Sequence, residues 1–218
     1  MTILALEFSS AQRSVAVLRA GAGSNTLLTG VTETGSVSTK AFEMIESALR
    51  QAQLEREQIE CLAVGLGPGS YTGIRAAIAV AQGWQFARGI KLVGIGSADA
   101  IAARAHTDGL RGRIGVVIDA QRNEWYLAPY ALDEGWQQSG PLSLVTQAEA
   151  QKFSAEADLM IGPEVAQWFP QGRTVYPHAA AVAALASEST RFVAGEKLEP
   201  IYLRETKFVK APTPRRID

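Results

Sequence analysis

A glycine-rich loop is the stretch of this sequence with the clearest potential for chemistry. It reads GLGPGSYTGIR over residues 65–75, between a short apolar run and a long alanine-rich segment. This order predicts a strand, a loop and a helix. The unpaired N–H groups at a helix N-terminus attract anions, and a bare glycine loop lets a ligand approach them. The candidate residues of a phosphate or nucleotide site are therefore Gly67, Gly69, Ser70, Thr72 and Gly73.

The same loop has a simpler interpretation as a tight turn that aims the helix at its packing partner, and residue types alone favour it. It is not a P-loop, because no Gly-Lys-Ser or Gly-Lys-Thr sequence closes it. It is not a nucleophile elbow around Ser70, because Pro68 and Thr72 occupy the flanking glycine positions. Ser70 or Thr72 is expected to cap the helix by accepting a backbone hydrogen bond.

Two carboxylates, Glu7 and Asp119, each follow a predicted strand and are the best pair for holding a magnesium ion through water. Capping of a turn or exposure to solvent is the interpretation that their positions favour. His106 and His178 are far apart in the sequence, and Cys61 is the single cysteine. These side chains are too few for a convincing zinc or iron site. We therefore predict neither a metal site nor a catalytic residue.

The composition is that of an ordinary globular protein. Of 218 residues, 47% are hydrophobic and 20% charged, and the formal net charge is −1. This balance gives no overall attraction to nucleic acid, which clustered Lys and Arg normally provide. The single cysteine excludes a disulfide framework and fits a reducing compartment. No run approaches the ~20 apolar residues of a membrane span. We expect a cytoplasmic protein that does not bind membranes.

The order of predicted elements indicates a duplicated α/β architecture. The first half reads β-β-β-α-β-α, with strands over 2–8, 14–20, 26–33 and 61–66 and helices over 38–53 and 73–88. A short strand over 92–95 and a helix capped by Ser97 follow, and 106–112 is the best linker. The second half has strands over 114–119, 124–130 and 159–161, a short helix after Pro163 and a helix over 178–191. Both halves open with a strand, a carboxylate, a turn and a strand, which predicts two lobes, 1–105 and 106–218.

The helix over 73–88 is unusual because it is apolar nearly all round. Such a helix is normally covered on more than one side. Its second face either packs on the helix over 38–53 or forms with that helix an exposed patch that docks a partner. Small residues, including Ala79 and Gly83, would let another helix come close. The basic tail over 207–218 is expected to be a mobile end, with an electrostatic contact to RNA or a partner as the alternative.

The glycine loop, together with ILALEFSS at the start, VVIDAQRNEWY in the middle and EPIYLR near the end, resembles the TsaB/YeaZ family of bacterial tRNA threonylcarbamoyladenosine (t6A) biosynthesis proteins. The resemblance covers nearly the whole chain. It implies the two-lobed actin, sugar-kinase and Hsp70 (ASKHA) fold and a role in placing a threonylcarbamoyl group on the adenosine beside the tRNA anticodon. It also implies two partners, the catalytic paralogue TsaD and the ATPase TsaE. Older names describe glycoprotease-like or M22 peptidase homologues.

Within that resemblance, the residues indicate a subunit without catalysis of its own. Ser97 and Ile101 stand where the catalytic paralogue has two metal-binding histidines. The runs that match the Asp-x-Gly phosphate loops of the superfold are EFS over 7–9 and DAQ over 119–121, and both lack the glycine. We therefore expect no bound cofactor in the isolated chain, with ATP or ADP only at a junction between subunits.

The resemblance implies that a TsaD-like subunit docks on the two helices of the first half. The candidate docking residues are Phe42, Ile45, Leu49, Ala77, Val80, Ala81 and Trp84. The same surface would close a homodimer when the partner is missing, and tRNA would be contacted only indirectly. Two alternatives to this scaffold role stay open. One is a nucleotide-dependent enzyme of the sugar-kinase type that uses the glycine loop with Glu7 and Asp119. The other, the least favoured, is a metallopeptidase.

Overall fold

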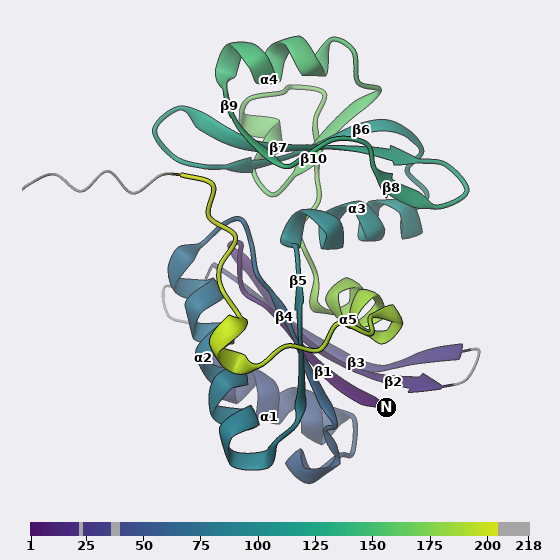
Figure 1. The fold of residues 1–218 in the computed structure, drawn as a ribbon. Coiled ribbons are helices and arrows are strands. Elements are labelled where there is room, and N and C mark those ends of the chain that lie inside the picture. The colour runs from purple at the N-terminus through teal and green to yellow at the C-terminus, as the bar shows by residue number, and fades with distance from the viewer. Residues whose placement is uncertain (22–23, 36–39, 205–218) are drawn as a thin grey trace, which may run out of the picture.

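The protein is built from two mixed β-sheets, one above the other, with helices on both faces of each (Figure 1). The computed structural model describes residues 1–21, 24–35 and 40–204. The first sheet has the order β3-β2-β1-β4-β5 and the second the order β11-β10-β6-β7-β8, with β9 paired to β7. The strands of the first sheet are β1 Thr2–Glu7, β2 Gln12–Gly21, β3 Ser24–Thr34, β4 Cys61–Gly65 and β5 Lys91–Ile95. Those of the second are β6 Gly112–Asp119, β7 Glu124–Leu132, β8 Trp136–Gln138, β9 Ser143–Thr146, β10 Leu159–Gly162 and β11 Arg173–Thr174.

The two sheets repeat one topology. In the first, β1 is antiparallel to β2 and parallel to β4, which continues parallel to β5. In the second, β6 is antiparallel to β7 and parallel to β10, which continues parallel to β11. The order of strands and their relative directions therefore agree between the halves. The predicted duplicated ASKHA architecture is confirmed.

The helices are shared between the halves. α1 (Ala41–Gln51) and α2 (Tyr71–Arg88) cover one face of the first sheet, and α4 (Gln147–Ser154) covers the far face of the second. α3 (Ser97–Thr107) follows the first sheet in the chain but packs on the second, with Ile101 among Ile114 and Val116. α5 (Ala179–Glu188) follows the second sheet but packs on the first, with Val182 beside Ile3. Between the two sheets, α3 and α5 lie against each other (Figure 1).

Most predicted elements are present, with shifts at their ends. The predicted cap at Ser97 is wrong: Gly96 is the N-cap of α3, and Ser97 begins the helix with its hydroxyl turned inward. α3 continues to Thr107, into the predicted linker. Sequence reasoning missed β8, β9, α4 and β11. The division at residues 105 and 106 stays a prediction. The tail over 207–218 and the predicted helix start at 38–39 lie outside the described residues.

No helix in the described ranges combines the length and the apolar character that crossing a membrane requires.

His178 holds α5 against the first sheet and makes that contact sensitive to pH. It is the N-cap of α5: its Nδ1 accepts a hydrogen bond from the Ala180 N–H at 3.2 Å, and its Nε2 lies 3.1 Å from Thr32 Oγ1 on β3. The neighbouring Ala179 N–H donates to Ser14 Oγ on β2 at 2.8 Å. Burial, and then the charge of Arg104, lower the pKa of His178 from its ordinary 6.5. The neutral imidazole is therefore the form that fits this site.

Because the folded chain lowers the pKa of His178, we expect the protein to lose stability in mild acid. Because the pKa is lower in the folded chain, the unfolded chain takes up the proton first as the pH falls. The stabilising contribution is complete above the unfolded pKa of 6.5 and declines below it. We expect the Tm to drop between about pH 7.5 and pH 5, and His178→Asn, which keeps an N-cap acceptor, to remove much of that drop. Thermal unfolding at several pH values measures this, with His106→Asn as the histidine control. An unchanged profile in His178→Asn would contradict it.

Candidate functional site

The glycine loop lies directly on the end of β1. The Ser70 N–H donates to the Ser9 carbonyl at 2.6 Å. A Cβ atom at Gly69 would lie 2.1 Å from the same oxygen, and one at Gly73 would lie 2.0 Å from the Phe8 carbonyl oxygen. Both glycines are therefore needed for the close approach of the chain to itself, which supports the simpler interpretation of the loop. The predicted N-cap at Ser70 is confirmed, since its Oγ accepts from the Gly73 N–H at 3.4 Å.

Part of the proposed anion loop still faces outward. Ser70 and Thr72 are exposed at the start of α2, whereas Gly67 and Gly73 are buried. The N–H of Gly67 is used inside the protein, where it donates to Ser97 Oγ at 3.0 Å. Binding of an anion to these five residues stays a prediction. The part of the loop that such an anion could reach is the stretch from Gly69 to Thr72.

Glu7 is enclosed in the protein interior. Its Oε1 accepts from the Ser9 N–H at 2.8 Å, and its Oε2 accepts from Ser97 Oγ at 2.8 Å. Burial raises the pKa of this carboxyl, while the bonds from Ser9 and Ser97 lower it. A Cβ on Gly65 would lie 2.0 Å from Glu7 Oε2, so that glycine makes room for the carboxylate. Through Ser97, Glu7 connects β1, the glycine loop and α3 inside the protein. It does not line the cleft described below.

Asp119, the other predicted carboxylate, caps the turn between β6 and β7. Its two oxygens accept from the Gln121 backbone N–H at 2.7 Å and from Gln121 Nε2 at 2.9 Å. Asp119 interacts with Glu164: burial, followed by the charge of Asp119, raises the pKa of Glu164. Sequence reasoning missed Glu164. The signal available was its position just after Gly162-Pro163, at the end of strand β10.

A cleft of about 460 Å³ separates the two lobes. Ser9, Ser10 and Ser70 line it from the first lobe, and Asp119 and Glu164 from the second. Tyr71 and Tyr202 lie at the same cleft and meet edge to face, with ring centroids 5.8 Å apart. The lining thus includes serine hydroxyls and two carboxylates. Across the residues described, no three His, Cys, Asp or Glu side chains are grouped so as to hold a metal ion.

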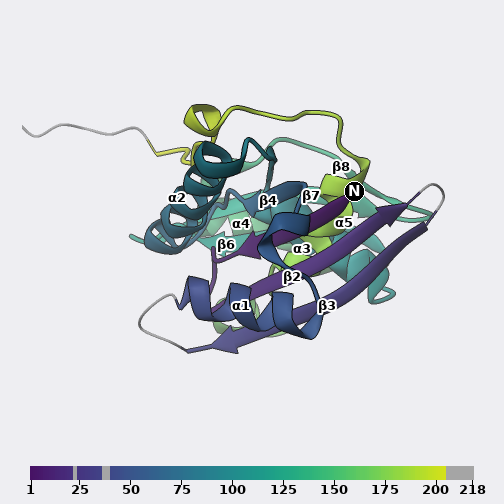
Figure 2. The same ribbon diagram turned by 90° about the horizontal axis from the view of Figure 1, so that it is seen from below.

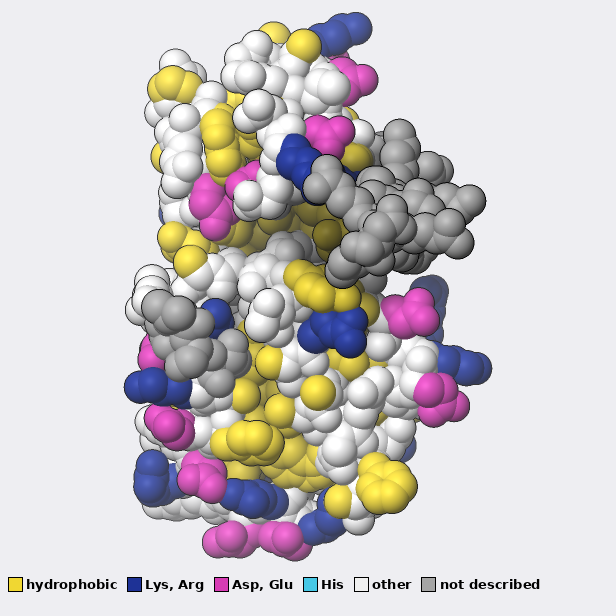
Figure 3. Space-filling view, turned by 90° about the vertical axis from the view of Figure 1, so that its left-hand side faces the viewer, with side chains coloured by type: hydrophobic (Ala, Val, Ile, Leu, Met, Phe, Trp, Pro, Cys, Tyr) yellow, Lys and Arg dark blue, Asp and Glu magenta, His cyan; other side chains and the backbone are white. Residues whose placement is uncertain are grey.

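A second hollow, the helix groove, lies between α1 and α2 and has a volume of about 400 Å³. Figure 3 shows hydrophobic side chains gathered over these helices, with charged side chains around them. Two ion pairs border the groove: Arg88 to Glu57 at 2.9 Å, and Arg56 to Glu46. Its apolar lining is Phe42, Ile45, Ala79, Val80, Gly83, Trp84 and Ala87.

The structure divides the seven predicted docking residues into two groups. Phe42 is 67% exposed, and Val80 and Trp84 are partly exposed; all three line the helix groove, with Ile45 at its floor. The remaining three, Leu49, Ala77 and Ala81, are buried in the core of the first lobe, because those sides of α1 and α2 face the sheet. The additional lining residues that sequence reasoning left out of the docking set are Ala79, Gly83, Ala87 and the four charged residues at the border.

Comparisons with known proteins agree on one family. The family model for TsaD, tRNA N6-adenosine threonylcarbamoyltransferase, matches residues 37–197. The TsaB protein of Haemophilus influenzae, named for tRNA threonylcarbamoyladenosine biosynthesis, is 33% identical over 128 residues, which are 59% of this chain and 53% of the relative. The Escherichia coli protein of the same name is 26% identical over 183 residues, 76% of this chain and 79% of the relative. The match thus spans about half the length of the Haemophilus relative.

A solved structure extends the likeness to the whole fold. The structure of YeaZ from Pseudomonas aeruginosa superposes with a TM-score of 0.77 at 26% identity, covering 93% of this chain and 99% of that one. The family model covers well over half of the chain, and the fold of YeaZ is reproduced across both lobes. The chain therefore belongs to the family of TsaD, tRNA N6-adenosine threonylcarbamoyltransferase, and within it to the TsaB/YeaZ group.

Proposed function

We propose that this protein is a non-catalytic scaffold subunit in the biosynthesis of threonylcarbamoyladenosine in tRNA. Its partner is a TsaD-like catalytic paralogue, and a TsaE-like ATPase is a third member of the assembly. The observation that carries this proposal is the helix groove, an exposed apolar hollow on a chain of the TsaB/YeaZ group. Contiguous apolar surface of this kind is typical of protein docking sites.

The composition of the helix groove fits a docking site for a helix. Large side chains, Phe42 and Trp84, stand beside the small residues Ala79, Gly83 and Ala87, which recur every four residues along α2. Small residues at this spacing let a second helix approach closely, while the aromatic side chains supply anchor area. The ion pairs at the border give the polar rim that such interfaces normally have.

The positions that match the metal-binding histidines of the paralogue are used for other purposes. The Ser97 hydroxyl donates to Glu7 and accepts from the Gly67 N–H, and Ile101 is fully buried beneath the second sheet. Ser97 is thus bonded to the first lobe, and Ile101 is packed in the core of the second. This supports a subunit that acts by holding its partner.

Omitting the protein from a reconstituted modification reaction tests the proposal. The assay contains the TsaD-like and TsaE-like proteins of the same genome, ATP, a source of threonylcarbamoyl-adenylate and unmodified tRNA. We expect t6A formation only when this chain is added, and a stable complex with the TsaD-like protein by analytical ultracentrifugation. Full modification without the chain would overturn the proposal. Turnover of ATP by the isolated chain would favour the alternative, a nucleotide-dependent enzyme of the sugar-kinase type.

Gly83 gives the docking proposal a prediction with two readouts. It lies inside α2, and a Cβ placed on it meets no atom within 4 Å, so nothing in this chain requires a glycine there. In a helix interior, Gly→Ala stabilises by about 1 kcal/mol, which raises the Tm of a chain this size by roughly 2–4 °C. We therefore expect Gly83→Ala to be more stable and yet to bind the TsaD-like protein more weakly. Calorimetric unfolding and titration measure the two effects, and unweakened binding would show that nothing approaches Gly83.

A further inference from the structure

The segment from Ser189 to Arg204 forms a third crossing between the lobes, which we call the strap. The other two crossings run through α3 and α5, which are packed together. In Figure 1 the strap leaves the end of α5, passes α2 and rises to the second lobe on the opposite side of the molecule from α3 and α5. Figure 2 shows it running beside α2. A contact between the strap and the second lobe therefore lies on the other side of the molecule from the two packed crossings.

The attachment of the strap to the first lobe is extensive. Val193 pairs with Leu92 at the edge of the sheet, its N–H donating at 3.0 Å. Gln85 Oε1 accepts from the Gly195 N–H at 2.7 Å, and Gln82 Nε2 donates to the Gly195 carbonyl at 2.9 Å. Further along, Leu198 is buried in the core of the first lobe, and the Ile201 N–H donates to Leu66 at 2.8 Å.

The strap is attached to the second lobe by its last residues: the Leu203 backbone hydrogen-bonds Tyr126 on β7, and Arg204 contacts the turn after β6. The Arg204 Nη2 donates to the carbonyls of Ala120 at 3.0 Å and Gln121 at 3.2 Å, and it pairs with Glu124 at 2.5 Å. The side chains of Arg204 and Glu124 are 22% and 37% exposed, so water and competing ions reach the pair. The strap is thus held to the second lobe by the Leu203 backbone and the partly exposed Arg204, whereas several hydrogen bonds and the buried Leu198 hold it to the first lobe.

Arg204 also bears on the shape of the cleft. Its two carbonyl acceptors belong to the turn between β6 and β7, in which Gln121, Arg122 and Asn123 have φ of 64°, 60° and 60°. A non-glycine residue with a positive φ costs of order 1 kcal/mol of conformational energy, and it keeps this conformation only where surrounding contacts offset that cost. The same turn carries Asp119, which lines the cleft, and the strap carries Tyr202, which also lines it. The contact of Arg204 therefore joins two segments that line the cleft.

We infer that Arg204 is a releasable clasp: bound to the turn after β6 it fixes the opening between the lobes, and released it frees both the strap end and the turn that carries Asp119. The clasp is a conformational device of this chain alone and does not depend on the scaffold role proposed above.

Distance measurements between spin labels on the two lobes test the clasp. Labels are placed at Arg50→Cys on α1 and Gln151→Cys on α4, both exposed positions. The native Cys61 does not interfere, because it is fully buried and burial raises the pKa of its thiol to about 11. We expect a narrow distribution in the parent chain, and a broader, longer one in Arg204→Ala and Glu124→Gln. Arg191→Ala, which removes an exposed arginine of the same strap, is the matched control.

Amide hydrogen exchange separates local fraying from release of the lobes. We expect exchange at Ile201, Gln121 and Glu124 to become roughly tenfold faster or more in Arg204→Ala, since charge-assisted hydrogen bonds are lost. Arg204→Lys should restore part of the protection. Faster exchange with an unchanged spin-label distribution would overturn the inference, because α3 and α5 would then hold the lobes by themselves. Unchanged exchange and distances in both clasp variants would overturn it as well.

Discussion

Replacing Trp84 with glutamate should abolish docking of the TsaD-like subunit while leaving the protein folded. Trp84 is partly exposed, lines the helix groove and packs its inner side on the core of the first lobe. Truncating an aromatic anchor at the centre of an interface costs roughly 2–4 kcal/mol, and a carboxylate left there also loses its hydration. We therefore expect the dissociation constant to rise by about 100-fold or more, measured by titration calorimetry.

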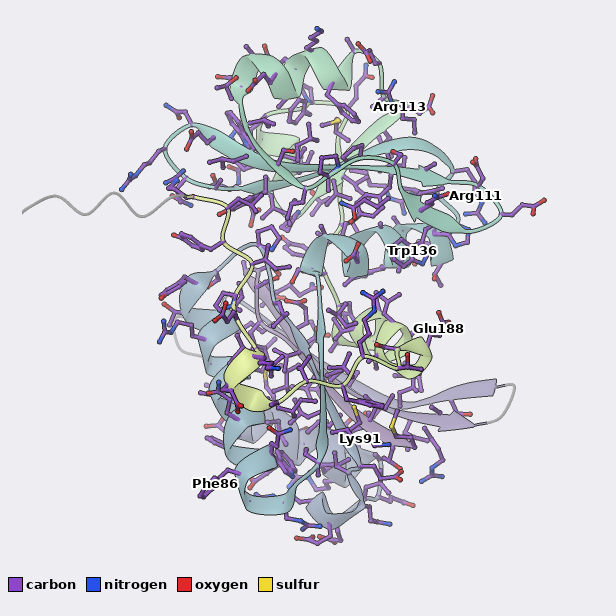
Figure 4. All side chains as sticks on the ribbon, viewed as in Figure 1. Phe86, Lys91, Arg111, Arg113, Trp136 and Glu188 are labelled. Atoms are coloured by element: carbon purple, nitrogen blue, oxygen red, sulfur yellow. The ribbon has the colours of Figure 1, made fainter. Side chains whose placement is uncertain are left out.

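Phe86→Glu is the matched control on the same helix. Phe86 is 96% exposed, does not line the helix groove and projects from α2 into solvent (Figure 4). The same charge at this position should leave docking within a few-fold of the parent chain. Loss of binding in Phe86→Glu with normal binding in Trp84→Glu would place the docking surface on the outer side of α2 and contradict the groove. Circular dichroism of both variants checks the fold.

Replacing Gly73 with alanine should destabilise the protein, although Gly73 lies in a helix. Helix propensity alone predicts a gain of about 1 kcal/mol, since Gly73 lies in the first turn of α2. The added Cβ, however, would lie 2.0 Å from the Phe8 carbonyl oxygen, a backbone atom that cannot rotate away. We expect a net loss of about 3 kcal/mol, seen as a Tm lower by roughly 6–12 °C.

Gly83→Ala is the internal comparison for that loss. Both substitutions add one methyl group to α2, and they differ in what the methyl group meets. Opposite signs of the change in unfolding free energy would show that the glycine loop is shaped by its contact with β1. A stabilised Gly73→Ala variant would show that the loop can move off β1, and would reopen its interpretation as a site for an anion.

The sequence predicted the elements whose pattern is long and regular. The buried strands β1 and β4 follow from short apolar runs and the amphipathic α1 from apolar periodicity, and the repeat of strand, carboxylate, turn and strand indicated the duplicated lobes. β8 and β11 are three and two residues long, too short for a periodicity to be read. α4 had an overlooked signal: Thr146 and Glu149 form a capping box, with the spacing typical of a helix start.

The candidate site was predicted less well, because its contacts join residues distant in sequence. The bond from Ser97 to Glu7 spans 90 positions, and nothing local distinguishes a buried carboxylate from a capping one. The strap has no regular pattern, yet the polar interruptions Gln82 and Gln85 in an otherwise apolar helix are its attachment points. In the helix groove, periodicity identified the right pair of helices but did not separate the side that faces the sheet from the side that faces solvent.

The exchange of α3 and α5 has a consequence for how the polypeptide is made. When the first sheet has been synthesised, the helix that covers its inner face has not, since α5 follows the whole second sheet in the chain. Ile3, Ala16 and Val93 stay uncovered until then. Neither half is therefore expected to survive as a separate gene product, and maturation of the nascent chain should be completed only when its last helix emerges.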